Sequence, residues 1–307
     1  MNTPSNAMNG SSLGSQGIAP AAFSATRLFF WSIRREFWEN RLIYLVPLVA
    51  AAVFLVAYLI GILALPGHRM RTVLTLAPAK QRAQIELPYE IAAALIMGTA
   101  LLVGIFYSLD ALYGERRDRS ILFWKSMPVS DLTTVLSKLA IPLVIIPVLS
   151  FAIAVVTQFI MLLLASTVLV GSGANIAALW TQQSVFRFSL ELFYHMLTVH
   201  GLWYAPLYAW LLLVSAAAPR APFVWAVFPP FVIWGVEKMA FNTTYFLSLL
   251  KVRLTGPSDP EMPRNADFMS MLIPHHFFSQ PGLWAGLAVA AVFLAIAVRL
   301  RRYRGPI

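Results

Sequence analysis

The sequence predicts an all-α integral membrane protein: a six-transmembrane-helix bundle with an N-terminal amphipathic interfacial helix and a short cytoplasmic helix between two spans. Three observations predict this fold class. Of the 307 residues, 59% are hydrophobic and only 12% are charged, about half the charged fraction of a soluble protein. The mean hydropathy is +0.72. Charge-free stretches such as 42–65 are long enough to cross about 30 Å of hydrocarbon as helices.

The net charge of +10 and the absence of cysteine exclude several classes of function. The 23 lysines and arginines are spread between long apolar stretches, so they form no continuous basic face and no nucleic acid is expected as a partner. A chain without cysteine has no disulfide framework, no thiolate metal site and no cysteine nucleophile. We therefore interpret the basic excess as a signal of membrane topology.

The N-terminal part predicts a tail followed by a helix in the membrane surface. Residues 1–23 are small and polar and lack the pattern of a signal peptide, which predicts a disordered cytoplasmic tail. Within 24–41, apolar side chains such as Phe29, Ile33 and Phe37 recur at helical spacing beside arginines. The residues expected to contact lipid headgroups and acyl chains are Phe29, Phe30, Trp31, Arg34, Arg35, Phe37 and Trp38. Alternatively, these aromatic side chains pack on neighbouring spans.

Six stretches predict transmembrane helices, which with the interfacial helix form one domain over 24–307. The spans are expected at about 42–65, 91–110, 139–170, 196–218, 222–240 and 283–299. The charge-free stretch between Lys138 and Arg187 exceeds one span, and turn residues at 171–175 end the third helix. The segment 241–250 is too short to cross and predicts a helix on the outer face.

The distribution of lysine and arginine predicts that both termini lie in the cytoplasm, because basic loops stay on that side. This orientation places the basic residues of 24–41, of the loop at 111–138 and of the segment after 299 on one side of the membrane. The basic loop at 66–90 would lie on the opposite side, and it counts against this orientation.

The loop at 111–138 is highly charged, yet its centre at 121–124 is apolar. Pro128 ends a short helix, and Ser130 is a suitable N-cap for the next one. A short helix that is charged at its start and aromatic at its end suits docking into a groove of a soluble partner. The alternative interpretation is a solvated loop that follows the positive-inside rule.

Two parts of the sequence resemble a known family. The stretch 112–130, LYGERRDRSILFWKSMPVS, followed by Lys138, resembles the inner loop of permease subunits of the ABC-2 (type-2 ABC exporter) family. The stretches 221–230, APFVWAVFPP, and 237–244, EKMAFNTT, are also similar to that family. The resemblance covers nearly all of the chain after residue 23. It implies a transmembrane permease subunit that moves a hydrophobic or amphipathic substrate by alternating access.

The resemblance also implies partners and a location. These are two copies of a separate ABC ATPase subunit, a second copy of this permease or a homologue, and the lipid bilayer of the bacterial cytoplasmic (inner) membrane. The 113–127 segment would be the coupling helix received by the ATPase. Its coupling residues would be Glu115, Arg116, Arg117, Asp118, Arg119, Phe123, Trp124 and Lys125. Because the chain contains no phosphate-binding G-x-x-x-x-G-K-[ST] motif, we expect no enzyme activity and no cofactor here, with ATP and magnesium on the partner.

Ionisable residues near the outer ends of the spans are the remaining candidates for polar contacts. These are Glu191, His195, Glu237 and Lys238. We expect Glu237 to pair with Lys238 beside it or with an arginine across the outer face. On a regular helix Glu191 and His195 share a face, but His200 lies about 140° round from His195, so no metal site is predicted.

Two other classes of function compete with a permease subunit. An ATP-independent secondary transporter or channel needs paired charges at mid-membrane or a polar pore stripe, and most predicted spans are uncharged there. An intramembrane lipid- or peptide-processing enzyme needs a convergent catalytic constellation, which the sequence does not indicate.

Overall fold

The chain is helical throughout the part that its structure describes. This computed structural model describes residues 25–64, 78–127, 129–172, 185–256 and 277–307, and these ranges contain helices and no strand. The all-α prediction is confirmed for them. The predicted tail at 1–23 and Pro128 lie outside the described residues.

The helices follow the predicted order with shifted boundaries. They are α1 (Ala25–Glu39), α2 (Leu42–Ala64), α4 (Pro78–Asp110), α5 (Tyr113–Arg117), α6 (Ser120–Ser126), α7 (Asp131–Ala140), η1 (Ile141–Ile145), α8 (Ile146–Ser172), α10 (Val185–His195), η2 (Met196–Trp203), α11 (Ala205–Ala217), α12 (Pro222–Phe241), α13 (Tyr245–Thr255), η3 (Phe277–Ser279) and α15 (Pro281–Tyr303). Helix α4 begins well before the predicted span at 91–110 because helical structure continues into polar sequence. Within these residues, five helices are long and apolar enough to cross a membrane, and the number rises to six if α10–η2 and α11, which are bent by 45°, form one span.

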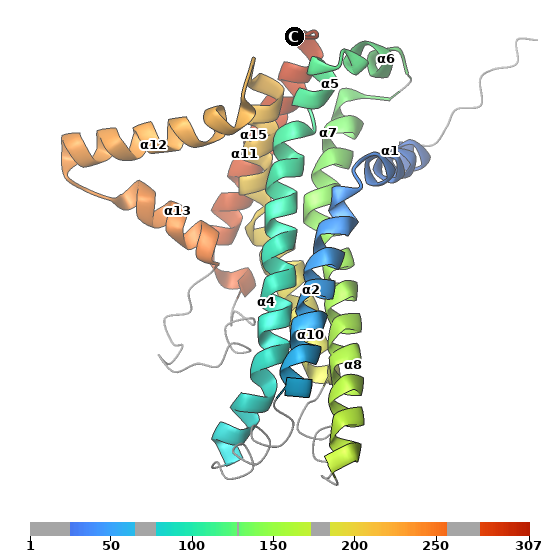
Figure 1. The fold of residues 1–307 in the computed structure, drawn as a ribbon. Coiled ribbons are helices and arrows are strands. Elements are labelled where there is room, and N and C mark those ends of the chain that lie inside the picture. Colours follow the sequence, from blue (N-terminus) through green and yellow to red (C-terminus); the bar gives the residue numbers. More distant parts are fainter. Residues whose placement is uncertain (1–24, 65–77, 128, 173–184, 257–276) are drawn as a thin grey trace, which may run out of the picture.

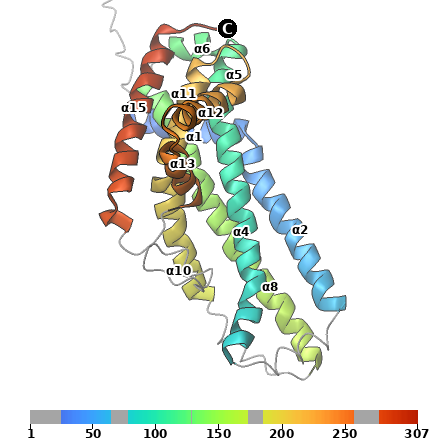
Figure 2. The same cartoon turned by 90° about the vertical axis from the view of Figure 1, so that its left-hand side faces the viewer.

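The long helices pack side by side around several apolar clusters (Figures 1 and 2). Helices α2, α4 and α8 contact one another, and α11 contacts both α4 and α15. Gly104 of α4 allows the ring of Tyr208 to lie against the α4 backbone, because a Cβ there would come within 2.8 Å of the Tyr208 hydroxyl. The chain's C terminus, α5, α6 and the start of α7 lie at one end of this bundle (Figure 1), which we call the charged end.

Two π-helical segments interrupt the third and fourth spans and contact each other. Segment η1 joins α7 to α8 and contains Pro142, and η2 leads into the 45° bend before α11. Gly201 of η2 lies close to the backbone oxygen of Leu143 in η1. In a π turn the hydrogen bonds skip one residue further than in an α-helix, which changes the face that the following helix presents.

Helix α12 departs from the predicted arrangement of six packed spans. It has the length and hydropathy of a span, but it leaves the charged end and runs across the long axes of α2, α4 and α8 (Figures 1 and 2). Ala221 precedes it with a left-handed φ of 46°, and only Ala226 on α12 is buried. Helix α13 then returns toward the bundle, at about the position in the chain of the helix predicted for 241–250. Hydropathy predicts α12 itself but carries no information about its direction.

Candidate functional site

The predicted coupling segment consists of two short helices instead of one. Arg119 has a left-handed φ of 58° and separates α5 from α6. The hydroxyl of Ser215 on α11 accepts hydrogen bonds from the backbone N–H groups of Leu112 and Tyr113, at 3.0 and 2.8 Å, which anchors the start of α5. The Ser130 side chain accepts the N–H of Thr133 at 3.0 Å, so the predicted N-cap of α7 is confirmed.

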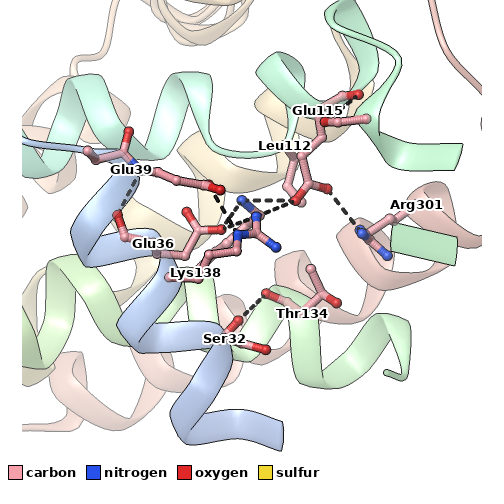
Figure 3. A network of polar contacts seen from close by, with 12 residues as sticks. Ser32, Glu36, Glu39, Leu112, Glu115, Thr134, Lys138 and Arg301 are labelled. Atoms are coloured by element: carbon pink, nitrogen blue, oxygen red, sulfur yellow. Dashed lines mark hydrogen bonds and ion pairs between the residues drawn. The ribbon is translucent and has the colours of Figure 1, made fainter. Parts of the chain in front are cut away.

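A buried lysine joins two carboxylates at the charged end (Figure 3). The Nζ of Lys138 on α7 lies 2.7 Å from Glu36 of α1 and 3.2 Å from Glu115 of α5. The side chains of Lys138 and Glu115 are only 3% and 6% exposed. The hydroxyl of Tyr107 on α4 donates to the second oxygen of Glu36 at 2.8 Å. One ammonium group thus joins α5 and α7 to α1, and Lys138 and Glu36 are 102 positions apart in the sequence.

The network extends through arginines on α1 and α15. Arg301 of α15 lies 3.0 Å from Glu115 and 2.5 Å from Asp131, and Arg35 lies 3.0 Å from Glu36 and 3.6 Å from Glu115. We call Arg35, Glu36, Glu115, Asp131, Lys138 and Arg301 the ion-pair network; it contains three acids and three bases. Balanced charges and mutual hydrogen bonds are the condition under which buried ions are tolerated.

Other side chains of the coupling segment contact helix ends near the C terminus. Arg116 is buried and donates to the backbone oxygens of Ala216 and Ala218 at 2.9 and 3.1 Å, which are carbonyls at the end of α11. Lys125 donates to the backbone oxygens of Arg302 and Arg304 at 3.3 and 3.2 Å. The segment is therefore attached to α11 and α15 as well as to α1 and α7.

The opposite face of the coupling segment is exposed. Phe123 is 58% exposed, and Arg117, Asp118 and Arg119 are also exposed. Arg117 lies 2.9 Å from Asp118, and this hydrogen bond lowers the pKa of Asp118. Trp124 is half-buried. The predicted coupling residues thus separate into an outward set of Arg117, Asp118, Arg119 and Phe123 and an inward set of Glu115 and Arg116, while Trp124 and Lys125 contact other parts of the chain.

Helix α1 lies across the direction of α2 beside the charged end (Figure 1). Phe37 and Ile33 pack against the core cluster of the bundle, whereas Trp31 and Trp38 are exposed. Of the remaining predicted contacts, Phe29 is half-buried, Phe30 and Arg34 are exposed, and Arg35 is half-buried with its guanidinium 3.5 Å from the centre of the Trp124 ring. The packing of Ile33 and Phe37 on the bundle agrees with the alternative interpretation, and contact of the exposed side chains with lipid stays a prediction.

At the end of the bundle away from the charged end, Glu191 pairs with Arg187 across one helical turn of α10, at 2.7 Å. His195 and His200 lie with ring centres 5.6 Å apart, although a regular helix would separate them. The π-helical segment explains the difference, since it brings residues five apart onto one side. No group of three or more possible metal ligands occurs among the described residues.

Glu237 and Lys238 contact their own hairpin instead of distant arginines. Glu237 accepts the backbone N–H groups of Tyr245 and Phe246 at 2.6 and 2.9 Å, so it closes the turn between α12 and α13 and caps α13. Lys238 donates to the Asn242 side chain at 2.8 Å. The expected pairing of Glu237 with Lys238 or an arginine is not what the structure has, because the turn places the α13 N-terminus within its reach.

The other end of α13 is attached to the bend in the fourth span. Arg253 donates to the backbone oxygens of Trp203 and Gly282 at 3.1 and 2.8 Å, and its guanidinium lies over the Trp203 ring. The hairpin and the bundle enclose an apolar groove of about 300 Å³ lined from α4, α11, α12 and α13. It includes Ile105, Leu207, Phe231 and Leu250. Its lining suits an acyl chain or another apolar group.

Sequence reasoning missed five members of the site: Glu36, Tyr107, Asp131, Lys138 and Arg301, of which Lys138 is named only beside the family motif. Glu36 is one of two acids in an arginine-rich helix, and Arg301 is one of several basic residues at the end of α15. Neither signal identifies a partner. Comparisons of the chain with protein families, curated proteins and solved structures find no match.

Proposed function

We propose that this protein is the transmembrane permease subunit of an ATP-driven exporter, and that a separate ATPase subunit docks on α5 and α6. The observation that carries the proposal is the two-sided construction of this segment. Its outer face presents Phe123 between exposed charges, while its inner face is ion-paired through Glu115 to α7 and α15. An exposed aromatic anchor surrounded by charges is typical of a docking surface.

The ion-pair network supports transmission of movement from the docking surface to the bundle. Separating Glu115 from both Lys138 and Arg301 would take its buried carboxylate away from the two nearest cations, and breaking a buried ion pair costs about 3–5 kcal/mol. A partner that displaces α5 therefore moves α1, α7 and α15 together more readily than it breaks these contacts. Movements of the partner during its ATP cycle would in this way be transmitted to the membrane spans.

We further propose that six spans lie in the bacterial cytoplasmic membrane with both termini in the cytoplasm, and that α1 rests in its inner surface. The exposed apolar side chains of α12 and α13 would contact lipid and a second permease copy or a homologue. The apolar groove beside α12 suits part of a hydrophobic or amphipathic substrate.

A co-purification and coupling experiment tests this function. The full chain is expressed with an affinity tag in a bacterial host, and the partner is identified by mass spectrometry after mild detergent extraction. We expect an ABC ATPase in the eluate. In the same purification, Phe123→Ala combined with Arg117→Ala is expected to reduce the amount of ATPase in the eluate about tenfold or more. Central aromatic anchors commonly contribute over 1.4 kcal/mol to the free energy of binding.

The matched control is Phe186→Ala with Arg220→Ala. Phe186 is 82% exposed and lies away from the charged end on α10, and Arg220 is exposed outside α5 and α6. Recovery of the ATPase with this control is expected to equal that of the native chain. If no ATPase is recovered, or if both double variants behave alike, the proposed docking on α5 and α6 is wrong.

A further inference from the structure

A groove at the charged end lies outside the proposed ATPase docking surface and shares one residue, Asp131, with the ion-pair network. It has a volume of about 350 Å³ and runs between the start of α7 and the last turns of α15. Its apolar wall is formed by Leu132, Ala295 and Val298, and two arginines, Arg299 and Arg302, stand at its edge. It therefore combines an apolar surface with cationic groups.

The two arginines carry positive charge that the described part of the chain does not neutralise. Both are exposed, and neither guanidinium has a hydrogen bond or ion pair with another described residue. Asp131 also lines the groove, but its carboxylate is engaged by Arg301 at 2.5 Å. An acid held by another base offers little repulsion to an incoming anion.

The position of the groove matches the depth of lipid headgroups. Arg299 directly follows the apolar part of α15, a helix that is long and apolar enough to cross a membrane. Leu132 is exposed on the neighbouring α7. In a bilayer, arginines at this position reach phosphate groups while the apolar wall remains beside acyl chains.

We propose that this groove binds an anionic phospholipid. The guanidinium groups of Arg299 and Arg302 donate hydrogen bonds to the phosphate, and one acyl chain lies on Leu132, Ala295 and Val298. A lipid with net negative charge is preferred over phosphatidylcholine, because the choline ammonium would lie beside two unneutralised cations.

Native mass spectrometry of the full chain in detergent tests the proposal. The probes are phosphatidylglycerol and phosphatidylcholine with identical acyl chains, added at increasing concentration. We expect phosphatidylglycerol to bind more tightly, and Arg299→Gln with Arg302→Gln to weaken its binding by about tenfold or more, since each charge-assisted contact is worth about tenfold.

Two further variants test whether binding depends on the groove and not on overall charge, and on the acyl chain as well as on the phosphate group. Arg41→Gln with Arg220→Gln removes the same charge from exposed positions elsewhere, and it is expected to leave phosphatidylglycerol binding within about twofold of native. Ala295→Trp fills the apolar wall without changing charge, and it is expected to weaken lipid binding as strongly as the arginine variant.

Three outcomes overturn the proposal. The first is an equal loss of phosphatidylglycerol binding in the two double-arginine variants, and the second is equal binding of the two lipids. The third is that inorganic phosphate, at the concentration of the lipid, displaces phosphatidylglycerol completely while Ala295→Trp leaves its binding unchanged. The last result would assign the arginines to a soluble phosphate compound. The thermal midpoint of each variant, measured in the same detergent, confirms that the groove variants remain folded.

Discussion

The ammonium group of Lys138 lies between two buried carboxylates that no other lysine reaches in the described network. Its replacement shows how single residues constrain this fold. A methionine fills similar volume but removes one of the three cations of the network, so that Arg35 and Arg301 alone must balance the buried carboxylates of Glu36, Glu115 and Asp131. Loss of this one ammonium group therefore weakens the contacts among α1, α5 and α7.

We expect Lys138→Met to destabilise the protein by about 3–5 kcal/mol, measured by unfolding in mixed detergent. Lys251→Met changes an exposed lysine on α13 and is expected to stay within about 0.5 kcal/mol of native. Adding Glu36→Gln to Lys138→Met is expected to recover part of the loss, with a coupling energy of about 0.5–3 kcal/mol. Strict additivity of the two substitutions would contradict the network.

Contacts between elements depend on positions where two backbones or rings approach closely. The approach of α4 to α11 at Gly104 is one such position, since the Tyr208 ring occupies the space of a side chain. Gly98 lies on the same helix, and a Cβ added there would have no neighbouring atom within 4 Å. The two glycines therefore differ in what surrounds them and not in helix context.

Gly104→Ala is expected to destabilise the bundle by about 1–3 kcal/mol, because the buried Tyr208 ring must move. Gly98→Ala is expected to be neutral or to stabilise by up to about 1 kcal/mol, through reduced backbone freedom of the unfolded chain. Equal effects in an unfolding measurement would show that α4 and α11 do not approach as described.

The α12–α13 turn gives a second prediction for an element. Glu237→Gln removes the charge that accepts two α13 N–H groups, and a carboxylate that accepts such groups stabilises the first turn of a helix. Amide hydrogen exchange at Tyr245 and Phe246 is therefore expected to become about fivefold faster. Lys238→Gln, on the next residue, should leave these two amides unchanged; acceleration there would assign the effect to the hairpin generally.

For the whole molecule, membrane orientation is open to direct measurement because the chain contains no cysteine. Ser126→Cys places a thiol at the end of α6 and Gln84→Cys places one in the first turns of α4, at the far end of the bundle, both at exposed positions. With a membrane-impermeant maleimide, the thiol at 84 is expected to react in intact bacterial cells and the thiol at 126 only after permeabilisation. The reverse pattern would invert the proposed topology.

Features of the fold that depend on local sequence could be predicted, whereas contacts between distant residues could not. Ser130 as an N-cap and the presence of long apolar helices follow from local spacing and hydropathy, and the structure has both. The contacts of Lys138 with Glu36 and of Arg301 with Glu115 join residues 102 and 186 positions apart. Their formation depends on helix packing, which composition does not encode. The direction of α12 likewise depends on how the helices pack and could not be predicted from hydropathy.

The paired π-helical segments make the number of residues in the spans as important as their identity. An α-helix rotates by about 100° per residue, so the extra residue in η1 sets the angular register between Lys138 in α7 and the buried Ile153 and Met161 in α8. Removing one residue within Ile141–Ile145 would restore a regular helix and turn α8 away from α2 and α4. We therefore expect exchange of the exposed Val144 for another apolar residue to be tolerated, whereas deletion of one residue would misalign α8 with its neighbours.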